Sequence, residues 1–192
     1  MLTTMYPQSF TRLEFGTRQP QELFDAVCHQ VNLTHLRIKW GSYSDISAIG
    51  NLRALEQLYI GSGARVESVD SISTLKALRG VYVENFQEIR DYSSFAALEN
   101  LESLTICGDG LGPRYIKVDS IDFLREMPQL RYFRFLTVRL RSGDYTPVLE
   151  LPNLEHLSLR SHRDVKKIFD ALNALPKLKW GLLKTRPQNY EK

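Results

Sequence analysis

The side chains that could carry acid–base, nucleophilic or metal chemistry are few in this sequence and widely separated. The four histidines are His29, His35, His156 and His162, and the two cysteines are Cys28 and Cys107. The histidine spacing matches no usual set of metal ligands, and the cysteines form no CxxC pair and have no feature of an activated thiol. We therefore predict no catalytic residue, no metal site and no cofactor, and a protein that is not an enzyme.

A second group of side chains suits binding rather than catalysis. Arg, Tyr and Trp are the types enriched where proteins contact one another, and here they recur in step along most of the chain. The predicted partner-binding set is Arg12, His35, Arg37, Lys39, Trp40, Tyr59, Tyr82, Glu84, Tyr132, Arg134, His156 and Arg160. Glu14 and Glu84 are the only acids at these positions, so the set predicts a protein partner with an acidic surface.

A glycine-rich stretch at 107–118, CGDGLGPRYIKV, predicts a long loop. Its glycine spacing matches neither GxGxxG nor GxxxxGK followed by Ser or Thr, the patterns of phosphate-binding loops. Long loops often carry binding residues, and the candidates here are Asp109, Arg114 and Tyr115. The stretch is either a surface insertion with no role or a contributor to partner selection.

An internal repeat predicts the elements that position these side chains. The pattern apolar, two variable, apolar, one variable, apolar occurs eight times, starting near residues 10, 33, 55, 78, 101, 130, 154 and 178. Its last two apolar positions, such as Leu104 and Ile106, alternate as in a strand, so Thr105 between them points outward. A second apolar series with three-residue spacing follows each strand and predicts a 3₁₀ or helical return. One repeat cannot bury its apolar face alone, so stacked repeats must share one core.

These repeats resemble those of leucine-rich repeat proteins, in the short regular class of internalin-like and protein-phosphatase-regulator-like chains. The resemblance rests on DISAIGNLRALEQLYI at 45–60, SISTLKALRGVYV at 71–83 and LENLESLTI at 98–106. It implies an α/β solenoid with about eight short parallel strands on a concave face and 3₁₀ or helical turns on the convex side. The Asn that the family usually places three residues after the third core position is absent. That position holds Gly41, Gly63, Phe86, Asp109, Val138 and His162.

The two ends of the repeat array have the patterns of longer helices. The segments 21–31 and 163–178 each place five apolar residues on one helical face, with Asp164 as the expected N-cap of the second. Val31 is among the residues expected on the buried face of the first helix. No linker or change of composition interrupts residues 1–192, which we interpret as a single domain.

Composition limits the class of protein further. With 25 Lys and Arg against 22 Asp and Glu, the net charge is +3, too small to indicate nucleic-acid binding by itself. No apolar run is long enough to span a membrane, and no secretory signal is evident, so a cytoplasmic protein is the simplest expectation. We predict a monomeric, non-catalytic protein-binding module, such as a regulator, an adaptor or an immunity-type inhibitor. The alternatives are a nucleic-acid-binding protein that uses the same Arg and Tyr face, and a structural, self-associating repeat protein.

Overall fold

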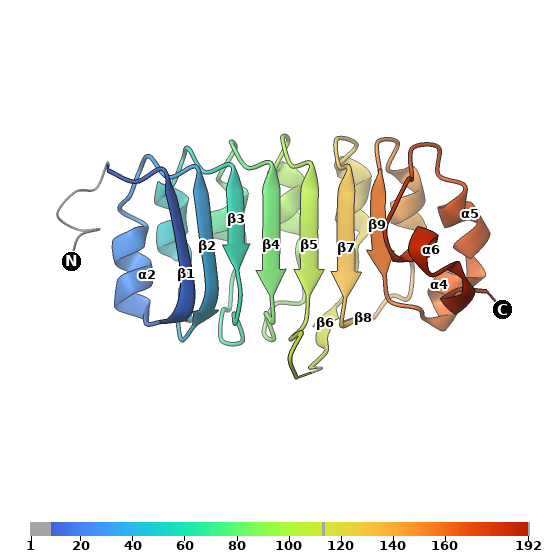
Figure 1. Ribbon diagram of the computed structural model, residues 1–192, viewed down its shortest axis with the longest axis horizontal. Coiled ribbons are helices and arrows are strands. Elements are labelled where there is room, and N and C mark those ends of the chain that lie inside the picture. Colours follow the sequence, from blue (N-terminus) through green and yellow to red (C-terminus); the bar gives the residue numbers. More distant parts are fainter. Residues whose placement is uncertain (1–8, 113, 192) are drawn as a thin grey trace.

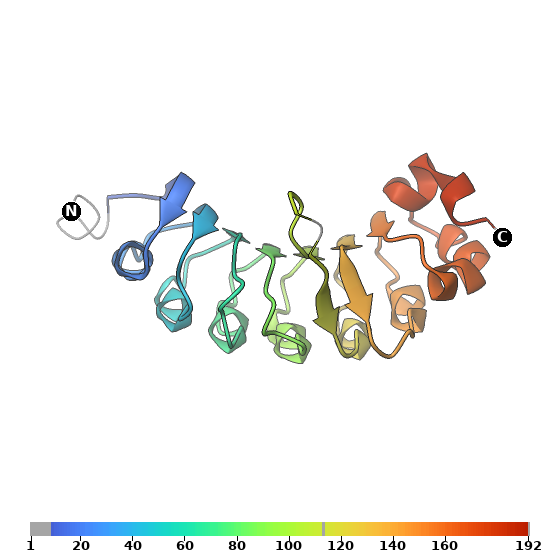
Figure 2. The same ribbon diagram turned by 90° about the horizontal axis from the view of Figure 1, so that it is seen from below.

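A curved parallel sheet is the main feature of the computed structural model, which describes residues 9–112 and 114–191 (Figure 1). Within these residues the sheet has seven strands in the order β1-β2-β3-β4-β5-β7-β9, and β6 pairs with β8 in a separate ladder. The sheet strands are β1 (Arg12–Gln19), β2 (His35–Gly41), β3 (Gln57–Ile60), β4 (Gly80–Glu84), β5 (Ser103–Cys107), β7 (Tyr132–Leu136) and β9 (His156–Leu159). Figure 2 shows the strands along the concave side and the helical turns along the convex side.

The convex turns confirm the prediction made from the three-residue spacing. They are η1 (Ser47–Asn51), η2 (Ser93–Ala97), η3 (Asp122–Glu126) and η4 (Thr146–Glu150), together with the short helix α3 (Asp70–Ser73). In the first of them Ile49 donates its N–H to the carbonyl of Ile46 at 3.0 Å, and Leu52 donates to Ile49 at 3.0 Å. Each apolar residue of the series thus closes one 3₁₀ bond while its side chain is buried in the core.

The strands bury alternate residues, as the repeat pattern predicts. Leu36 is 2% and Ile38 0% exposed on β2, and Leu104 and Ile106 on β5 are both 0% exposed. Thr105 differs from the prediction, since it faces the concave side but is only 4% exposed. It lies in register between Tyr82 and Arg134, which are much larger.

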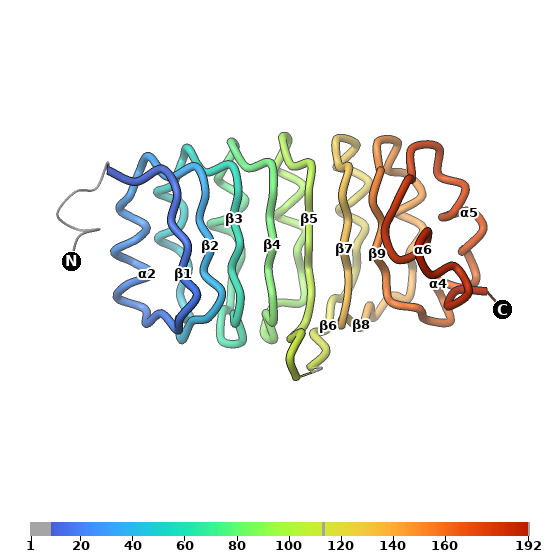
Figure 3. The backbone as a smooth tube through the Cα atoms, in the orientation of Figure 1, coloured from blue at the N-terminus to red at the C-terminus, as the bar shows by residue number. Residues whose placement is uncertain are grey.

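One backbone contact recurs at the start of every strand and sets the register. The carbonyl of Thr34 accepts hydrogen bonds from the N–H groups of Glu56 and Gln57 at 2.8 and 3.0 Å. The carbonyl that precedes each later strand of the seven-stranded sheet accepts the same pair of hydrogen bonds from the next repeat. Figure 3 shows the resulting coils stacked in step. Equivalent side chains of successive repeats therefore lie next to one another across the sheet.

The position that usually holds Asn is filled differently in this chain. The Phe86 ring is completely buried, and it lies so close to Gly63 that a Cβ there would be 2.5 Å from it. In the neighbouring turn the Tyr43 hydroxyl donates to the carbonyl of Gly61 at 2.5 Å. Aromatic rings that pack on a neighbouring glycine thus take the place of a polar side chain in these turns.

The prediction of an eighth strand at 178–183 is wrong. It is reduced to a single bridge between Trp180 and His156, after which α6 (Leu182–Thr185) begins. Gly181, at the repeat's second apolar position, has no side chain to bury, and its φ is +104°. A Cβ at Gly181 would lie 2.0 Å from the carbonyl oxygen of Leu157, so close backbone approach replaces strand pairing here.

The helical end repeats are present but shorter than predicted. The first helix, α2 (Gln21–Val27), ends four residues early, which leaves Val31 43% exposed. The second is divided into α4 (Arg163–Lys167) and α5 (Phe169–Asn173), because Ile168 has a non-helical backbone with φ −117° and ψ 16°. The N-cap is His162, whose ring accepts the N–H of Asp164, so Asp164 is not the cap. After α6 comes the last of these elements, η5 (Pro187–Asn189).

The 107–118 stretch is a loop only in its first part. Residues 116–118 form β6 (Ile116–Val118), which pairs in parallel with β8 (Val138–Leu140). Gly108 is required at the start of the loop, because a Cβ there would lie 2.3 Å from the carbonyl of Arg114 and 2.5 Å from that of Thr137. Pro113, one of the loop-forming residues of the sequence, lies outside the described residues. The loop rises on the concave side of the sheet (Figure 2).

We expect Leu104→Asp to lower the free energy of unfolding by about 3–5 kcal/mol, because it buries an unpaired charge. Ser103→Asp is the matched control, because Ser103 is half-buried and faces the concave side. Urea denaturation followed by circular dichroism measures both. Equal losses of stability would show that the phase of β5 is wrong.

Candidate partner-binding face

Register places most of the predicted binding residues on one face, in two rows. The first row contains Arg12, His35, Gln57, Gly80, Ser103, Tyr132 and His156. The middle row contains Glu14, Arg37, Tyr59, Tyr82, Thr105, Arg134 and Ser158. Residues that are more than 140 positions apart in sequence thus form one continuous surface, the concave face.

Aromatic side chains in neighbouring positions of these rows stack on one another. The rings of Tyr59 and Tyr82 are 4.2 Å apart between centroids and inclined by 15°. Tyr132 and His156 stack at 4.0 Å and 16°. Arg37 extends the first pair, with its guanidinium carbon 4.8 Å from the centroid of Tyr59. Parallel strands about 4.8 Å apart bring such rings into contact without rearrangement.

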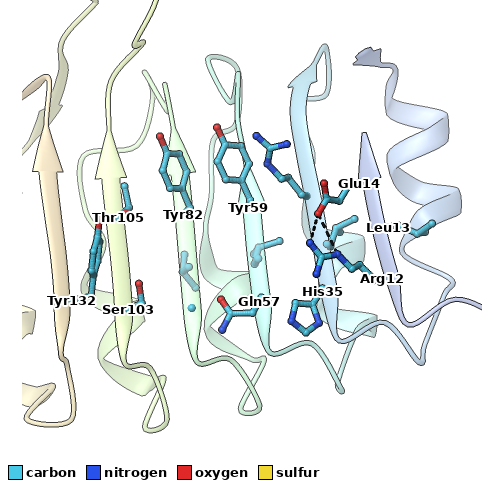
Figure 4. A pocket seen from close by; sticks show the side chains of 15 residues that line it. Arg12, Leu13, Glu14, His35, Gln57, Tyr59, Tyr82, Ser103, Thr105 and Tyr132 are labelled. Atoms are coloured by element: carbon cyan, nitrogen blue, oxygen red, sulfur yellow. Dashed lines mark hydrogen bonds and ion pairs between the residues drawn. The ribbon is translucent and has the colours of Figure 1, made fainter. Parts of the chain in front are cut away.

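Small residues separate the two aromatic pairs and leave a shallow depression of about 380 Å³. Gly80 is part of its lining, which extends over β2 and β1 to His35 and Arg12. Figure 4 shows Ser103 and Thr105 between Tyr82 and Tyr132. Gln57 lies across Gly80, where a Cβ would be 2.0 Å from the Gln57 amide oxygen. Gln57 and Ser103 are missing from the predicted set, because their residue types alone do not indicate a contact.

Lys39 and Glu84 belong to the support of the face rather than to its open surface. Lys39 Nζ lies 2.8 Å from Glu84 Oε2 and donates to the Tyr59 hydroxyl at 3.0 Å, and that hydroxyl donates to Glu84 at 2.9 Å. The Glu84 side chain is 8% exposed. Burial by itself lowers the pKa of Lys39, but the bonds to Glu84 and Tyr59 outweigh it, so the pKa is raised.

Cys107 lies next to this network and is buried. Its sulfur is 3.3 Å from the hydroxyl of Tyr82. Burial is the largest cause of the raised pKa of Cys107, and it also raises the pKa of Tyr82. The thiol is therefore held in its protonated, weakly nucleophilic form.

The charges that remain on the concave face are basic. Arg12 is paired with Glu14 at 2.5 Å, and Lys39 is paired with Glu84. In the part of the chain that the structure describes, neither Arg37 nor Arg134 forms an ion pair, although the pKa of Glu14 is lowered first by Arg12 and also by the charge of Arg37. Internal pairing therefore leaves two arginines of the middle row without an ion pair.

The predicted loop residues have different roles in the structure. The Asp109 carboxylate accepts the N–H groups of Leu111 and Gly112 at 2.9 and 3.2 Å, so it holds the loop together. Tyr115 lies beneath Arg160, whose guanidinium carbon is 4.5 Å from the ring centroid. Arg114 is exposed. Leu111, which the sequence reasoning missed, is 78% exposed near the loop tip.

Two tryptophans mark the margins of the face. Trp40 is half-buried beneath the Lys39 ammonium, which is 4.9 Å from its ring centroid, and it lines a separate depression with Arg18 and Arg65. Trp180 is 61% exposed and pairs with His156 through the backbone bridge. Trp180 was not predicted, although it continues the first row into the eighth repeat. That continuation was the signal that could have identified it.

The described residues contain neither a cluster of metal-ligating side chains nor a membrane-spanning helix. Among residues 9–112 and 114–191, no three His, Cys, Asp or Glu side chains come close enough together to hold a metal ion. No helix in these ranges has the length and apolar character needed to cross a membrane. The absence of a catalytic residue stays a prediction.

We expect Lys39→Met to lower the free energy of unfolding by about 2–3 kcal/mol, because it leaves the buried Glu84 carboxylate without its cation. The double variant Lys39→Met/Glu84→Gln should recover most of this loss. Arg12→Met is the control, because it breaks an exposed pair and should change stability far less. If Lys39→Met and Arg12→Met have equal effects in urea denaturation, the network does not support the face.

We expect His156 to titrate below the ordinary histidine pKa of 6.5, because burial first and the charge of Arg134 second both disfavour its protonated form. The fold then loses stability as pH falls below the unfolded-state pKa, since the unfolded chain binds the proton more readily. Arg134→Gln should raise the pKa of His156 only in part, because the burial remains. NMR titration of the imidazole signals measures this, and an unchanged value in the variant would contradict the coupling.

Known proteins resemble this chain mainly in structure. No family model matches the chain, and no curated protein is significantly similar to it. An internalin from Listeria monocytogenes has a TM-score of 0.61 at 22% identity over 82% of this chain and 43% of that one. Internalin C2 from the same organism has a TM-score of 0.62 at 18% identity, covering 93% of this chain and 82% of its own.

A plant protein has a similar fold. The LRR ectodomain of the Arabidopsis thaliana receptor kinase GASSHO1/SCHENGEN3 has a TM-score of 0.58 at 14% identity, covering 84% of this chain and 20% of its own. This chain therefore spans less than half of the first internalin and of the plant ectodomain. Identities this low show a shared fold. The chain folds as a leucine-rich repeat solenoid with internalin-like repeats.

Proposed function

We propose that this protein is a non-catalytic recognition module that binds another protein on its concave face. The observation that carries the proposal is the set of side chains left open there. Two aromatic pairs, Tyr59–Tyr82 and Tyr132–His156, flank small residues, and two arginines form no ion pair among the described residues. Aromatic and arginine side chains around a depression are typical of the centres of protein interfaces.

The fold supports the same proposal by analogy. The plant ectodomain with this fold was solved in complex with CASPARIAN STRIP INTEGRITY FACTOR 2. Fold alone does not determine function, so the proposal depends on the residues of this chain. Binding as a monomer, a cytoplasmic location and action as a regulator, adaptor or inhibitor are further parts of the proposal.

The charge pattern supports an acidic partner. Because the acids of the face are already paired internally, the charges available to a partner are those of Arg37 and Arg134. Opposite charges accelerate association, and salt weakens their attraction over a Debye length of about 8–10 Å. We therefore expect binding that weakens as the salt concentration rises.

The test is affinity capture from a lysate of the natural source, with the wild-type chain and an Arg37→Glu/Tyr82→Ala variant. Tyr59 is left unchanged, because its hydroxyl supports Glu84. The variant should lose the captured protein, or bind it at least ~10-fold more weakly, as expected for removal of two interface residues. Arg53→Glu is the matched control, because Arg53 bonds the carbonyl of Thr74 on the return side of the repeats.

Other outcomes would overturn the proposal. Equal capture by the wild type and the variant would place the contact elsewhere. Copurified nucleic acid that salt removes would favour the nucleic-acid interpretation. A concentration-dependent oligomer that Tyr82→Ala disrupts would favour self-association.

A further inference from the structure

A second depression, of about 410 Å³, lies in the C-terminal third of the concave face. Tyr132 and His156 border it on the sheet, and α6 contributes Leu182 and Thr185 from the chain that folds back beyond Trp180. Figure 2 shows this last part of the chain rising on the concave side of the sheet. The site therefore depends on the end of the array, where the eighth strand fails to form.

Arg134 is the charged group of this depression, and its hydrogen bonding is incomplete. Its Nε is buried and has no acceptor. Its neighbours in register are Thr105 and Ser158, which are uncharged. Ser158 is already engaged, since its hydroxyl lies 2.9 Å from His156 Nε2 and accepts the N–H of Leu182 at 3.2 Å.

An arginine in this state is suited to bind a carboxylate. Its Nε is closed to an incoming group, so a carboxylate can reach only the terminal nitrogens of the guanidinium. The planar guanidinium matches a carboxylate with two parallel N–H···O bonds. The two terminal nitrogens of Arg134 are not among the buried atoms that lack a hydrogen-bond partner, and the side chain is half-exposed. These nitrogens are therefore open to the depression.

Trp180 adds an apolar surface beside this charge. Its ring is largely exposed, while its backbone is held on both sides. Its N–H donates to Glu155 and its carbonyl accepts from Leu157, both at 3.2 Å. It continues the first row directly after the stacked Tyr132–His156 pair. A fixed, exposed tryptophan is a typical anchor for an aromatic or large apolar side chain.

We infer that this depression is a subsite for an acidic residue and a neighbouring aromatic residue of the partner. The carboxylate binds Arg134, and the aromatic ring packs against Trp180 and the Tyr132–His156 pair. The inference rests on the proposed function and names the chemistry that the partner presents. The carboxylate is that of an Asp or Glu side chain, and a probe that carries only a terminal carboxylate tests the other source.

The experiment uses blocked dipeptides and the full chain. Ac-Asp-Phe-NH₂ is the probe, Ac-Asn-Phe-NH₂ is its uncharged match, Ac-Gly-Phe-OH carries the terminal carboxylate, and inorganic phosphate tests for a general anion site. The readouts are the NMR signals of the Arg134 Nε–H and the Trp180 indole N–H. Ac-Asp-Phe-NH₂ should shift both signals, with an affinity ~10-fold above that of the Asn peptide and above that of Ac-Gly-Phe-OH.

Two variants, Arg134→Gln and Arg37→Gln, test whether the peptides bind at Arg134. Arg134→Gln should abolish the difference between the Asp and Asn peptides, whereas Arg37→Gln, at the other end of the middle row, should preserve it. Thermal melting confirms that each variant is folded. Equal binding of the Asp and Asn peptides, or loss through Arg37→Gln alone, would overturn the subsite. So would phosphate binding more tightly than both carboxylate peptides.

The subsite and the proposed function can fail separately. If Arg134→Gln leaves capture of the natural partner unchanged while Arg37→Glu/Tyr82→Ala removes it, the concave face binds the partner and the subsite is wrong. If the dipeptide binds at Arg134 but neither variant affects capture, the subsite stands and the proposed function fails.

Discussion

The interior of this protein is buried between repeats and not within any one of them, and the rest of the structure depends on that constraint. A coil of about 23 residues has one strand and one short turn, so its leucines are covered only when the next coil stacks on it. The carbonyl that precedes each strand accepts two N–H groups from the following coil, which keeps the stacking in step. Burial and backbone bonding therefore select the same register.

That register also builds the candidate site. Side chains that face away from the core must line up in rows, and a strand spacing of about 4.8 Å is close to the distance at which aromatic rings stack. Tyr59 and Tyr82 stack for this reason, as do Tyr132 and His156. The Lys39–Glu84 pair lies beside the first pair and fixes the Tyr59 hydroxyl. Ordered rings lose little conformational freedom on binding, which suits them to recognition.

The concave face is bordered by two segments that depart from the regular repeat. The extra residues after β5 form a loop held by Asp109, with Leu111 exposed near its tip. At the second departure, where the eighth strand does not form, the backbone at Gly181 lies against that of Leu157. The chain then turns back on the concave side. A perfectly regular solenoid would present an open strip. The two irregularities add side walls, and both lie near the C-terminal half of the sheet.

The class of fold follows from the repeat pattern, because spacing alone identifies which residues are buried. The positions of Leu36, Ile38, Leu104 and Ile106 in the core follow from it, as do the 3₁₀ turns and the side of the sheet on which the tyrosines lie. Which outward-facing residues remain available to a partner became clear only from the stacked repeats. Glu84 and Thr105 face the concave side but are buried by neighbours from other repeats, and Arg134 is left without an acceptor. The physical reason is that exposure and pairing depend on contacts between repeats about 23 residues apart, which the alternation within one strand does not contain.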